Sequence, residues 1–150
     1  MKKISQANKY VKFANGKRSK LKYHAMPDGA AVISLADGYV YISNAEIKDG
    51  RGGVYGLYFD RNGRVVDYKM LLSGTSRSCS GGVTPWNTYI SCEEVRDGQC
   101  WQIDPDPSSI NHSYPKATEI GRGYFEAIVS YRLEQGKAFH ISSTITTHHC

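Results

Sequence analysis

The chain has 150 residues and a mass of 16.7 kDa, with 15 Gly and with 11 Tyr against 4 Phe. A chain of this length is expected to form one domain, and its Gly- and Tyr-rich composition favours strands and turns over a helix bundle. The net charge of +5 is unevenly distributed, and no apolar run reaches the roughly 18 residues that a membrane-spanning helix needs.

The basic residues are concentrated near the N-terminus. Residues 1–22 hold eight of the 19 Lys and Arg residues and none of the 14 Asp and Glu residues, so residues 23–150 carry a net charge of −3. We predict a basic, flexible arm over residues 1–24, a type of segment that can contact nucleic acid or anionic lipid. Polar residues follow Met1-Lys2-Lys3 where a signal peptide would be apolar, so the localisation stays unknown.

Three turn signals, Asp37-Gly38, Asn62-Gly63 and Asp97-Gly98, each lie between apolar or aromatic runs. This pattern is the strongest short-range signal for a β-hairpin. No window of about twelve residues has a helical period. The predicted strands cover residues 30–35, 39–44, 54–60, 64–72, 88–92, 99–104, 117–120 and 125–131.

Short strands joined by tight turns predict an all-β fold, which is a sandwich, a barrel or a propeller. The run Leu57–Asp60 is echoed by Cys100–Asp104, with the two aspartates 44 residues apart. That spacing is the size of one propeller blade. This repeat favours a propeller, with chance similarity as the alternative. Together with the family resemblance given below, it leads us to predict a partial β-propeller, built of antiparallel β-meander blades, over residues 25–135, followed by an uncertain tail over residues 136–150.

The four cysteines, at positions 79, 92, 100 and 150, contain no C-x-x-C spacing of a zinc ribbon. Cys92 and Cys100 flank the Asp97-Gly98 turn, so a disulfide is possible if they are opposed across that hairpin. We favour the alternative that both are small, buried apolar residues. His148, His149 and Cys150 can bind a metal, but a chain terminus without a scaffold is expected to be flexible.

Cys79 lies in residues 72–86, which we predict to be a flexible, glycine-rich loop. Gly81-Gly82 permits close backbone approach and positive φ, and the nearby Arg77 is expected to lower the pKa of the Cys79 thiol. A thiolate in such a loop can bind a metal or attack an electrophile. The alternative is a turn that contains a buried cysteine.

Carboxylates follow two of the predicted strands, in the sequences Glu93-Glu94 and Asn44-Ala45-Glu46. Adjacent residues of a strand point to opposite faces, so only one of Glu93 and Glu94 is expected to face the same site as Cys79. Oxygen ligands at strand ends suit hard cations such as Ca²⁺. The alternative is that these acids are solvated surface residues.

Taken together, these residues resemble the PhoX-type alkaline phosphatase family. The similarity covers residues 27–127 and is strongest from Cys79 to Glu94, with the sequence Cys-Ser-Gly-Gly-Val-Thr-Pro-Trp-Asn-Thr-Tyr-Ile-Ser-Cys-Glu-Glu. The resemblance implies a β-propeller that hydrolyses phosphomonoesters with an iron and calcium cluster in its central channel. The expected activity is metal-assisted hydrolysis of small phosphomonoesters.

The resemblance also implies site residues. Cys79 matches the iron-ligating cysteine of the family, and Glu94 matches a metal-binding carboxylate. Glu126 resembles a further ligand position, and Glu46 is a fourth candidate ligand. Arg77 is our candidate catalytic residue, since a guanidinium group fits the oxygens of a phosphate. A surface or structural role is the alternative for Arg77.

The chain departs from the family pattern at Ser78, where Asn is common, and at Asn87, where Gly is usual. Family members are several times longer, so we expect a truncated or degenerate member with little phosphatase activity by itself. The open strand edges of a partial propeller favour self-association. The alternative function is a non-catalytic β-propeller-like binding module. Nucleic-acid binding is not expected, because residues 23–150 are acidic and contain no known RNA-binding pattern.

Overall fold

The computed structural model describes residues 3–112, 114–132 and 139–145, with side chains described for residues 3–112 and 114–125. These residues form strands and turns, and no helix capable of crossing a membrane occurs among them. The strands are β1 Tyr10–Lys12, β2 Arg18–Lys22, β3 Pro27–Leu35, β4 Gly38–Ala45, β5 Gly52–Asp60, β6 Val65–Thr75, β7 Ser78–Val83, β8 Tyr89–Glu93, β9 Gly98–Ile103, β10 Lys116–Gly123, β11 Phe125–Arg132 and β12 Phe139–Ile145.

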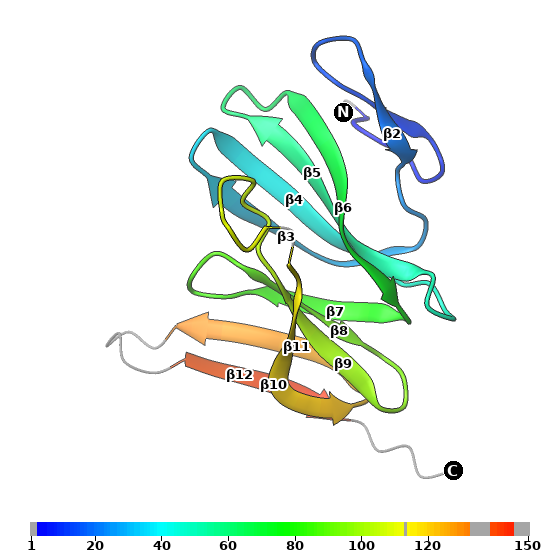
Figure 1. Ribbon diagram of the computed structural model, residues 1–150, viewed down its shortest axis with the longest axis vertical. Helices are drawn as coiled ribbons and strands as arrows, with labels where there is room; N and C mark the ends of the chain where they lie inside the picture. Colours follow the sequence, from blue (N-terminus) through cyan, green and yellow to red (C-terminus); the bar gives the residue numbers. More distant parts are fainter. Residues whose placement is uncertain (1–2, 113, 133–138, 146–150) are drawn as a thin grey trace.

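These strands form four antiparallel sheets. In Figure 1 the sheet of β1 and β2 lies at the top and the sheet of β3–β6 below it, and the sheets of β7–β10 and β11–β12 overlap in the lower half. Strands β1 and β2 form an N-terminal hairpin, and β11 and β12 form a C-terminal hairpin. Between them lie two four-stranded sheets, which we call sheet I (β3–β6) and sheet II (β7–β10). Strands that are adjacent in the sequence are also adjacent in each sheet, which is the order of a β-meander. The predicted all-β class with antiparallel meanders is confirmed.

The three predicted hairpin turns are also confirmed, because each joins two paired strands. Asp37-Gly38 joins β3 to β4, with Leu35 opposite Gly38. Asn62-Gly63 joins β5 to β6, and Gly63 has a φ of 71°, a left-handed conformation that glycine adopts without strain. Asp97-Gly98 lies between β8 and β9.

The sequence echo between Leu57–Asp60 and Cys100–Asp104 has a structural counterpart. The first run lies in β5, which is the third strand of sheet I, and the second run overlaps β9, which is the third strand of sheet II. The two sheets are therefore repeated units of the same strand order, and the echoed residues occupy corresponding strands.

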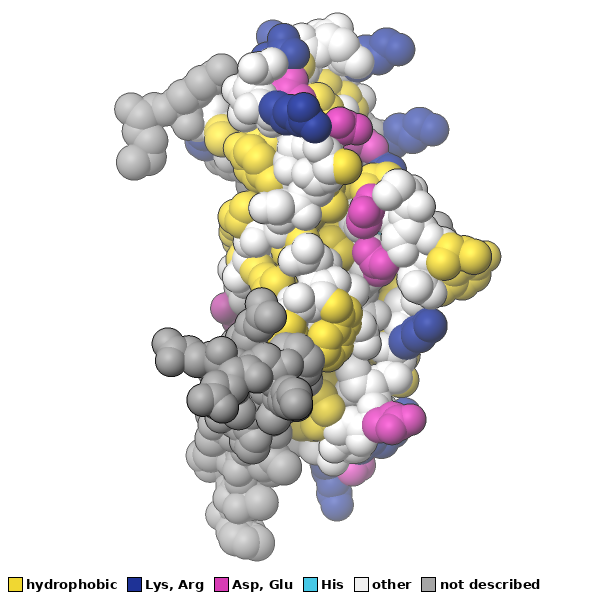
Figure 2. All heavy atoms as spheres, turned by 90° about the vertical axis from the view of Figure 1, so that its left-hand side faces the viewer, with side chains coloured by type: hydrophobic (Ala, Val, Ile, Leu, Met, Phe, Trp, Pro, Cys, Tyr) yellow, Lys and Arg dark blue, Asp and Glu magenta, His cyan; other side chains and the backbone are white. Residues whose placement is uncertain are grey.

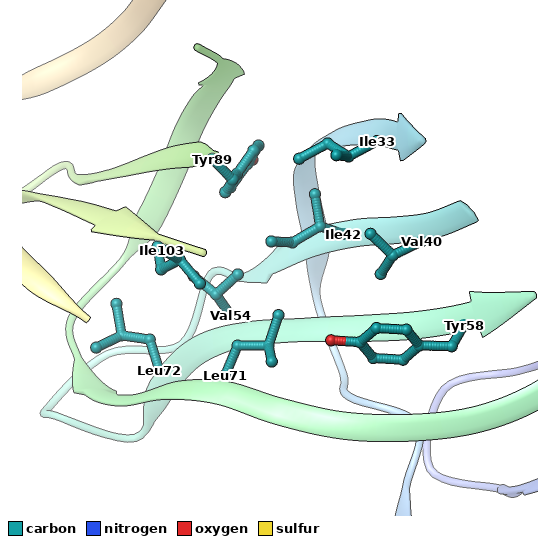
Figure 3. Close-up of a cluster of buried hydrophobic side chains, with 9 residues drawn as sticks. All are labelled: Ile33, Val40, Ile42, Val54, Tyr58, Leu71, Leu72, Tyr89 and Ile103. Carbon is teal, nitrogen blue, oxygen red and sulfur yellow. The ribbon is translucent and has the colours of Figure 1, made fainter. Parts of the chain in front are cut away.

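The main core lies between sheet I and sheet II, where side chains from alternate strand positions meet (Figure 3). The buried phenol of Tyr58 donates a hydrogen bond to the Pro105 carbonyl at 2.8 Å, so its polar end is satisfied. Apolar burial of this kind stabilises a fold by about 25 cal/mol per Å². The core residues are Ile33, Val40, Ile42, Val54, Tyr58, Leu71, Leu72, Tyr89 and Ile103.

The N-terminal hairpin packs on the other face of sheet I. Val11 of β1 is buried and lies in a cluster with Leu57, Phe59 and Tyr68. The Ala14 amide donates to the Val65 carbonyl at 2.8 Å, which ties the hairpin to the start of β6. The sequence patterns identified no strand in this segment, because its two strands are short and rich in Lys. The division of the chain into arm, domain and tail stays a prediction.

Cys92 and Cys100 form a disulfide, so the favoured interpretation of two buried thiols was wrong. The two residues are directly opposed between β8 and β9. Both are fully buried, in a cluster with Ile90 and Phe125. The burial was therefore predicted correctly, whereas the covalent bond depended on a strand register that the sequence could not define.

Replacing both cysteines, as Cys92→Ala/Cys100→Ala, should lower the free energy of unfolding. The bond closes a loop with a sequence separation of 8 residues. Without the bond, the unfolded chain gains conformational entropy, which lowers the free energy of unfolding by about 2.5 kcal/mol. We expect a corresponding fall in Tm of about 5–10 °C. Thermal unfolding of the oxidised proteins checks this, with Cys79→Ala as the control that keeps the disulfide. A double variant as stable as the wild type would contradict it.

Candidate metal centre at the junction of the two sheets

Charged and polar residues from several segments meet at one end of the junction between sheet I and sheet II. This end is where β4 finishes and β5 starts, since Asn44 pairs with Val54 there. The residues come from the start of β3, the end of β4, the crossover into β7, the end of β8 and the link between β10 and β11. They are Asp28, Glu46, Arg77, Cys79, Glu94 and Tyr124.

Arg77 forms the crossover from sheet I to sheet II. Its φ is 49°, a left-handed conformation that is uncommon outside glycine. Its amide donates to the Ile47 carbonyl at 2.9 Å, and its carbonyl accepts a hydrogen bond from the Glu94 amide at 2.9 Å. The crossover is therefore hydrogen-bonded to the segments that follow β4 and β8. These bonds fix the position of the Arg77 backbone, from which its side chain extends.

The Arg77 side chain lies between two carboxylates. Its Nε atom is 3.6 Å from Glu46 Oε1, and its Nη2 atom is 3.4 Å from Glu94 Oε2. Glu94 also accepts a hydrogen bond from the Tyr124 hydroxyl at 3.1 Å. The charge of Glu94 is the main cause of a raised pKa for Arg77, with Tyr124 and Glu46 adding to it. The Arg77 guanidinium thus forms ion pairs with Glu46, which follows a strand of sheet I, and with Glu94, which follows a strand of sheet II.

Cys79 lies in strand β7, so its predicted place in a flexible loop was wrong. The strand was missed because Gly81-Gly82 has a low intrinsic preference for strands. Close packing explains the glycines. A Cβ atom at Gly81 would overlap Tyr89, and one at Gly29 of β3 would lie 2.6 Å from the Cys79 carbonyl oxygen. The expected close approach is confirmed, although Gly81 does not have a positive φ.

The pKa of the Cys79 thiol is raised to about 12, opposite to the predicted direction. Burial is the largest cause, followed by the hydrogen bond to and the charge of Asp28, and then by the charges of Glu94 and Glu46. Arg77 does not lower the pKa as expected, because its guanidinium is paired with the two glutamates. The thiol is therefore protonated near neutral pH unless a cation offsets these acids.

Glu93 points away from this group and has a structural role. Its Oε1 atom accepts a hydrogen bond from the Ser76 amide at 2.7 Å, and its Oε2 atom accepts bonds from Gln99 and Trp101. The prediction that only one residue of the Glu93-Glu94 pair faces Cys79 agrees with this geometry. The charge of Glu94 raises the pKa of the Cys79 thiol, whereas Glu93 binds the Ser76 amide in the crossover.

Asn44 connects the two sheets at this end. It is fully buried, and its Nδ2 atom donates to the Cys79 and Ser80 carbonyls at 3.1 and 3.0 Å. Its Oδ1 atom has no hydrogen-bond partner among the described residues. Burying an amide oxygen without a hydrogen-bond donor costs free energy. This oxygen is therefore suited to bind a cation, or to accept a hydrogen bond from a residue outside the described part of the chain.

The chemistry of these side chains fits a metal, but the described ligand set is incomplete. One thiol and several carboxylates suit iron and calcium. Within residues 3–112 and 114–125, no three His, Cys, Asp or Glu side chains converge closely enough to hold an ion. The predicted ligand Glu126 lies in β11, just after the last residue whose side chain is described, and His148, His149 and Cys150 lie outside the described residues.

A family model described as "Alkaline phosphatase PhoX" matches residues 62–142, more than half of the chain. The chain belongs to the PhoX alkaline phosphatase family. No curated protein and no solved structure matches it. PhoX proteins are metal-dependent phosphatases, and the matched region of this PhoX chain includes Arg77, Cys79, Glu94 and Glu126. The match starts later than the resemblance found in the sequence, and it continues beyond Ala127.

Sequence reasoning missed two residues that the structure brings to the candidate site of this PhoX chain. Asp28 hydrogen-bonds the Cys79 thiol, and Tyr124 hydrogen-bonds Glu94. A signal for Asp28 was present, because Asp28-Gly29 begins the resemblance to the family. Tyr124 gave no such signal, since it lies on a link between two strands of different sheets.

Proposed function

We propose that this chain acts in the hydrolysis of phosphomonoesters, as part of a metal-dependent, alkaline-phosphatase-like enzyme. The family match supports the reaction class and small phosphate esters as substrates. The observation that carries the proposal is the gathering of Cys79, Asp28, Glu46 and Glu94 around one end of the sheet junction. Such a concentration of acidic groups is stabilised by a multivalent cation.

In this proposal, Cys79, Glu46, Glu94 and Glu126 are the metal ligands. A thiolate suits iron and carboxylates suit Ca²⁺, in agreement with the ions that the family resemblance implies. When bound, these ions supply charge neutralisation at the phosphate oxygens and activation of an oxygen nucleophile. The contribution of the chain itself is to hold ligands of both sheets together, through the bonds of Asn44 to the backbone of β7.

Arg77 is the proposed contact to a phosphate oxygen of the substrate. Its side chain is 35% exposed, and Glu46 and Glu94 orient its guanidinium from two sides. A guanidinium carries five N–H donors, so the two ion pairs leave donors for a substrate oxygen. An orientation fixed before the substrate arrives lowers the entropy lost on binding.

The proposal includes a partial propeller, in which sheet I, sheet II and the C-terminal hairpin are successive blades. The repeated meander order supports this arrangement, and so do the contacts of β7, the first strand of sheet II, with β3 and β11, the first strands of its neighbours. Cys79 would then lie on an inner strand. The outer edges at β6 and β10 would remain open to self-association.

We expect weak or absent phosphatase activity from the monomeric chain, because its candidate ligands lie at the open end of two sheets. Activity should appear in oligomeric fractions, and Arg77→Gln should lower it about 100-fold by removing donors to the transition state. The measurement is turnover of p-nitrophenyl phosphate across size-exclusion fractions supplied with Ca²⁺ and iron. Arg61→Gln, on the distant β5–β6 turn, is the matched control. A fully active monomer that is insensitive to Arg77→Gln would refute this account.

A further inference from the structure

The N-terminal hairpin presents an unusual surface of uncompensated positive charge. Every Lys and Arg residue described between residues 3 and 22 is exposed. Within the part of the chain that the structure describes, none of them forms an ion pair with an Asp or Glu side chain, and Lys and Arg side chains gather at the top of Figure 2. They are Lys3, Lys9, Lys12, Lys17, Arg18, Lys20 and Lys22.

The strand register fixes these cations close to one another. Lys12 is directly opposite Arg18, and like charges in opposed positions destabilise a β-ladder. The Val11 amide donates to Ser19 Oγ at 2.9 Å, and both of these residues are buried toward sheet I. The alternating side chains of β1 and β2 must therefore face outward. An anionic partner would relieve this repulsion.

A cavity of about 550 Å³ lies where the hairpin meets the β5–β6 turn. Its lining combines the cations Lys3, Lys12 and Arg64 with the apolar side chains Ile4, Phe13 and Val65. A lining that mixes cationic and apolar side chains fits an anionic group that is attached to hydrocarbon, although Arg64 is also paired with Asp60 at 2.7 Å. The cavity is at the opposite end of sheet I from Cys79, since Gly38 pairs with Asp60 near the turn and Asn44 pairs with Val54 near the candidate metal centre.

We propose that this end of the molecule, the hairpin with its cavity, binds the surface of an anionic phospholipid bilayer. Exposed apolar side chains accompany the cations, with Ile4 and Tyr10 each 51% exposed and Leu21 41% exposed. Lysines mixed with aromatic and aliphatic side chains are typical of proteins that lie at a membrane interface. Bidentate recognition of nucleic-acid phosphates and bases favours arginine, and Arg18 is the single arginine between residues 3 and 22.

The position of the hairpin is consistent with contact to a flat surface. It forms the top end of the molecule in Figure 1, beyond sheet I. Residues 23–150 have a net charge of −3, so they are repelled by an anionic bilayer. Contact through the hairpin alone therefore orients the molecule with sheet II and the candidate metal centre away from the lipid.

Co-sedimentation with vesicles tests the proposal on the full chain. The probes are vesicles of pure phosphatidylcholine, vesicles containing about one-third phosphatidylserine, and duplex DNA, each at about 0.1 M salt. We expect binding to the phosphatidylserine vesicles and none to phosphatidylcholine. Replacing four outward cations of the hairpin with Gln should weaken that binding at least tenfold. This variant is Lys12→Gln/Arg18→Gln/Lys20→Gln/Lys22→Gln.

A matched variant removes the same charge from the acidic part of the chain and should bind like the wild type. It is Lys48→Gln/Arg51→Gln/Arg96→Gln/Lys116→Gln. A second variant, Ile4→Ser/Leu21→Ser, should weaken binding to vesicles without reducing any binding to DNA. Circular dichroism shows whether each variant is folded. The proposal is overturned by absent vesicle binding, by equal losses in both charge variants, or by DNA binding tighter than vesicle binding.

Discussion

Replacing Gly81 with alanine should destabilise the protein by about 3 kcal/mol, the upper part of the range for overpacking a core. An added Cβ atom would overlap the Tyr89 hydroxyl and would lie 2.6 Å from the Ile90 carbonyl oxygen. Tyr89 is fully buried between sheet I and sheet II, and Ile90 belongs to the paired strand β8, so neither can move aside cheaply. Urea unfolding followed by Trp fluorescence measures the change.

Ser80→Ala is the matched control, because it changes the neighbouring residue of β7 without adding an atom. The Ser80 hydroxyl is buried and has no hydrogen-bond partner among the described residues. Its removal should change the free energy of unfolding by less than about 1 kcal/mol. If Gly81→Ala is as stable as Ser80→Ala, the packing of β7 against Tyr89 is not as the structure describes it.

Acidification should destabilise the protein between about pH 6.5 and pH 4 through His24. Burial lowers the pKa of His24 to about 4, from the 6.5 of an exposed histidine. In that interval the unfolded chain binds a proton that the folded chain does not. The stabilisation is complete above pH 6.5, and about 3 kcal/mol of it is lost as the pH falls to 4.

The contacts of His24 explain why its ring stays neutral. It is 5% exposed and stacks between Tyr23 and Tyr55, with centroids at 4.5 and 4.7 Å. The Tyr68 hydroxyl accepts a hydrogen bond from the His24 amide at 2.9 Å and lies 3.0 Å from Nδ1, while Nε2 lies 3.0 Å from Ser43 Oγ. We assign Nδ1 as the acceptor from Tyr68, since that hydroxyl has one proton to donate. Protonation of Nδ1 would remove this acceptor, so that the Tyr68 hydroxyl could only accept from Nδ1 and would have to place its own proton elsewhere.

Comparison of two variants isolates this effect. His24→Phe keeps an aromatic ring in the stack but cannot bind a proton, so its stability should depend less on pH between 4 and 6.5. His112→Gln should keep the wild-type dependence, because His112 is a partly exposed residue of the 105–115 loop. Chemical denaturation at several pH values is the measurement. A wild-type slope that survives in His24→Phe would assign the pH dependence to other groups.

Local sequence signals were sufficient for most of the fold. Asp37-Gly38, Asn62-Gly63 and Asp97-Gly98 each specify a turn by the backbone conformations that these residues adopt, and no distant contact is needed to interpret them. Alternating apolar residues then specify the strands on either side. The strands that were missed lack these signals. Strand β7 contains Gly81-Gly82, whose place in a sheet depends on a close approach to Tyr89 from another strand.

The candidate site was harder to predict because its properties depend on pairings between distant segments. The sequence places Arg77 two residues before Cys79, which favours a thiolate. The structure instead pairs Arg77 with Glu46 and Glu94, and it brings Asp28 to the thiol. The disulfide between Cys92 and Cys100 likewise depends on the register of β8 and β9. Spacing along the chain does not determine any of these contacts.

The metal content of the purified, folded chain tests the central claim that Cys79 and Glu94 belong to a metal centre. We expect calcium and iron in near-stoichiometric amounts by elemental analysis. Iron should be lost in Cys79→Ala, both metals should fall in Glu94→Ala, and Glu119→Gln, an exposed acid of β10, should retain both. A folded wild type without bound metal, or a Cys79→Ala variant with unchanged iron, would contradict the account and leave a non-catalytic binding module as the function.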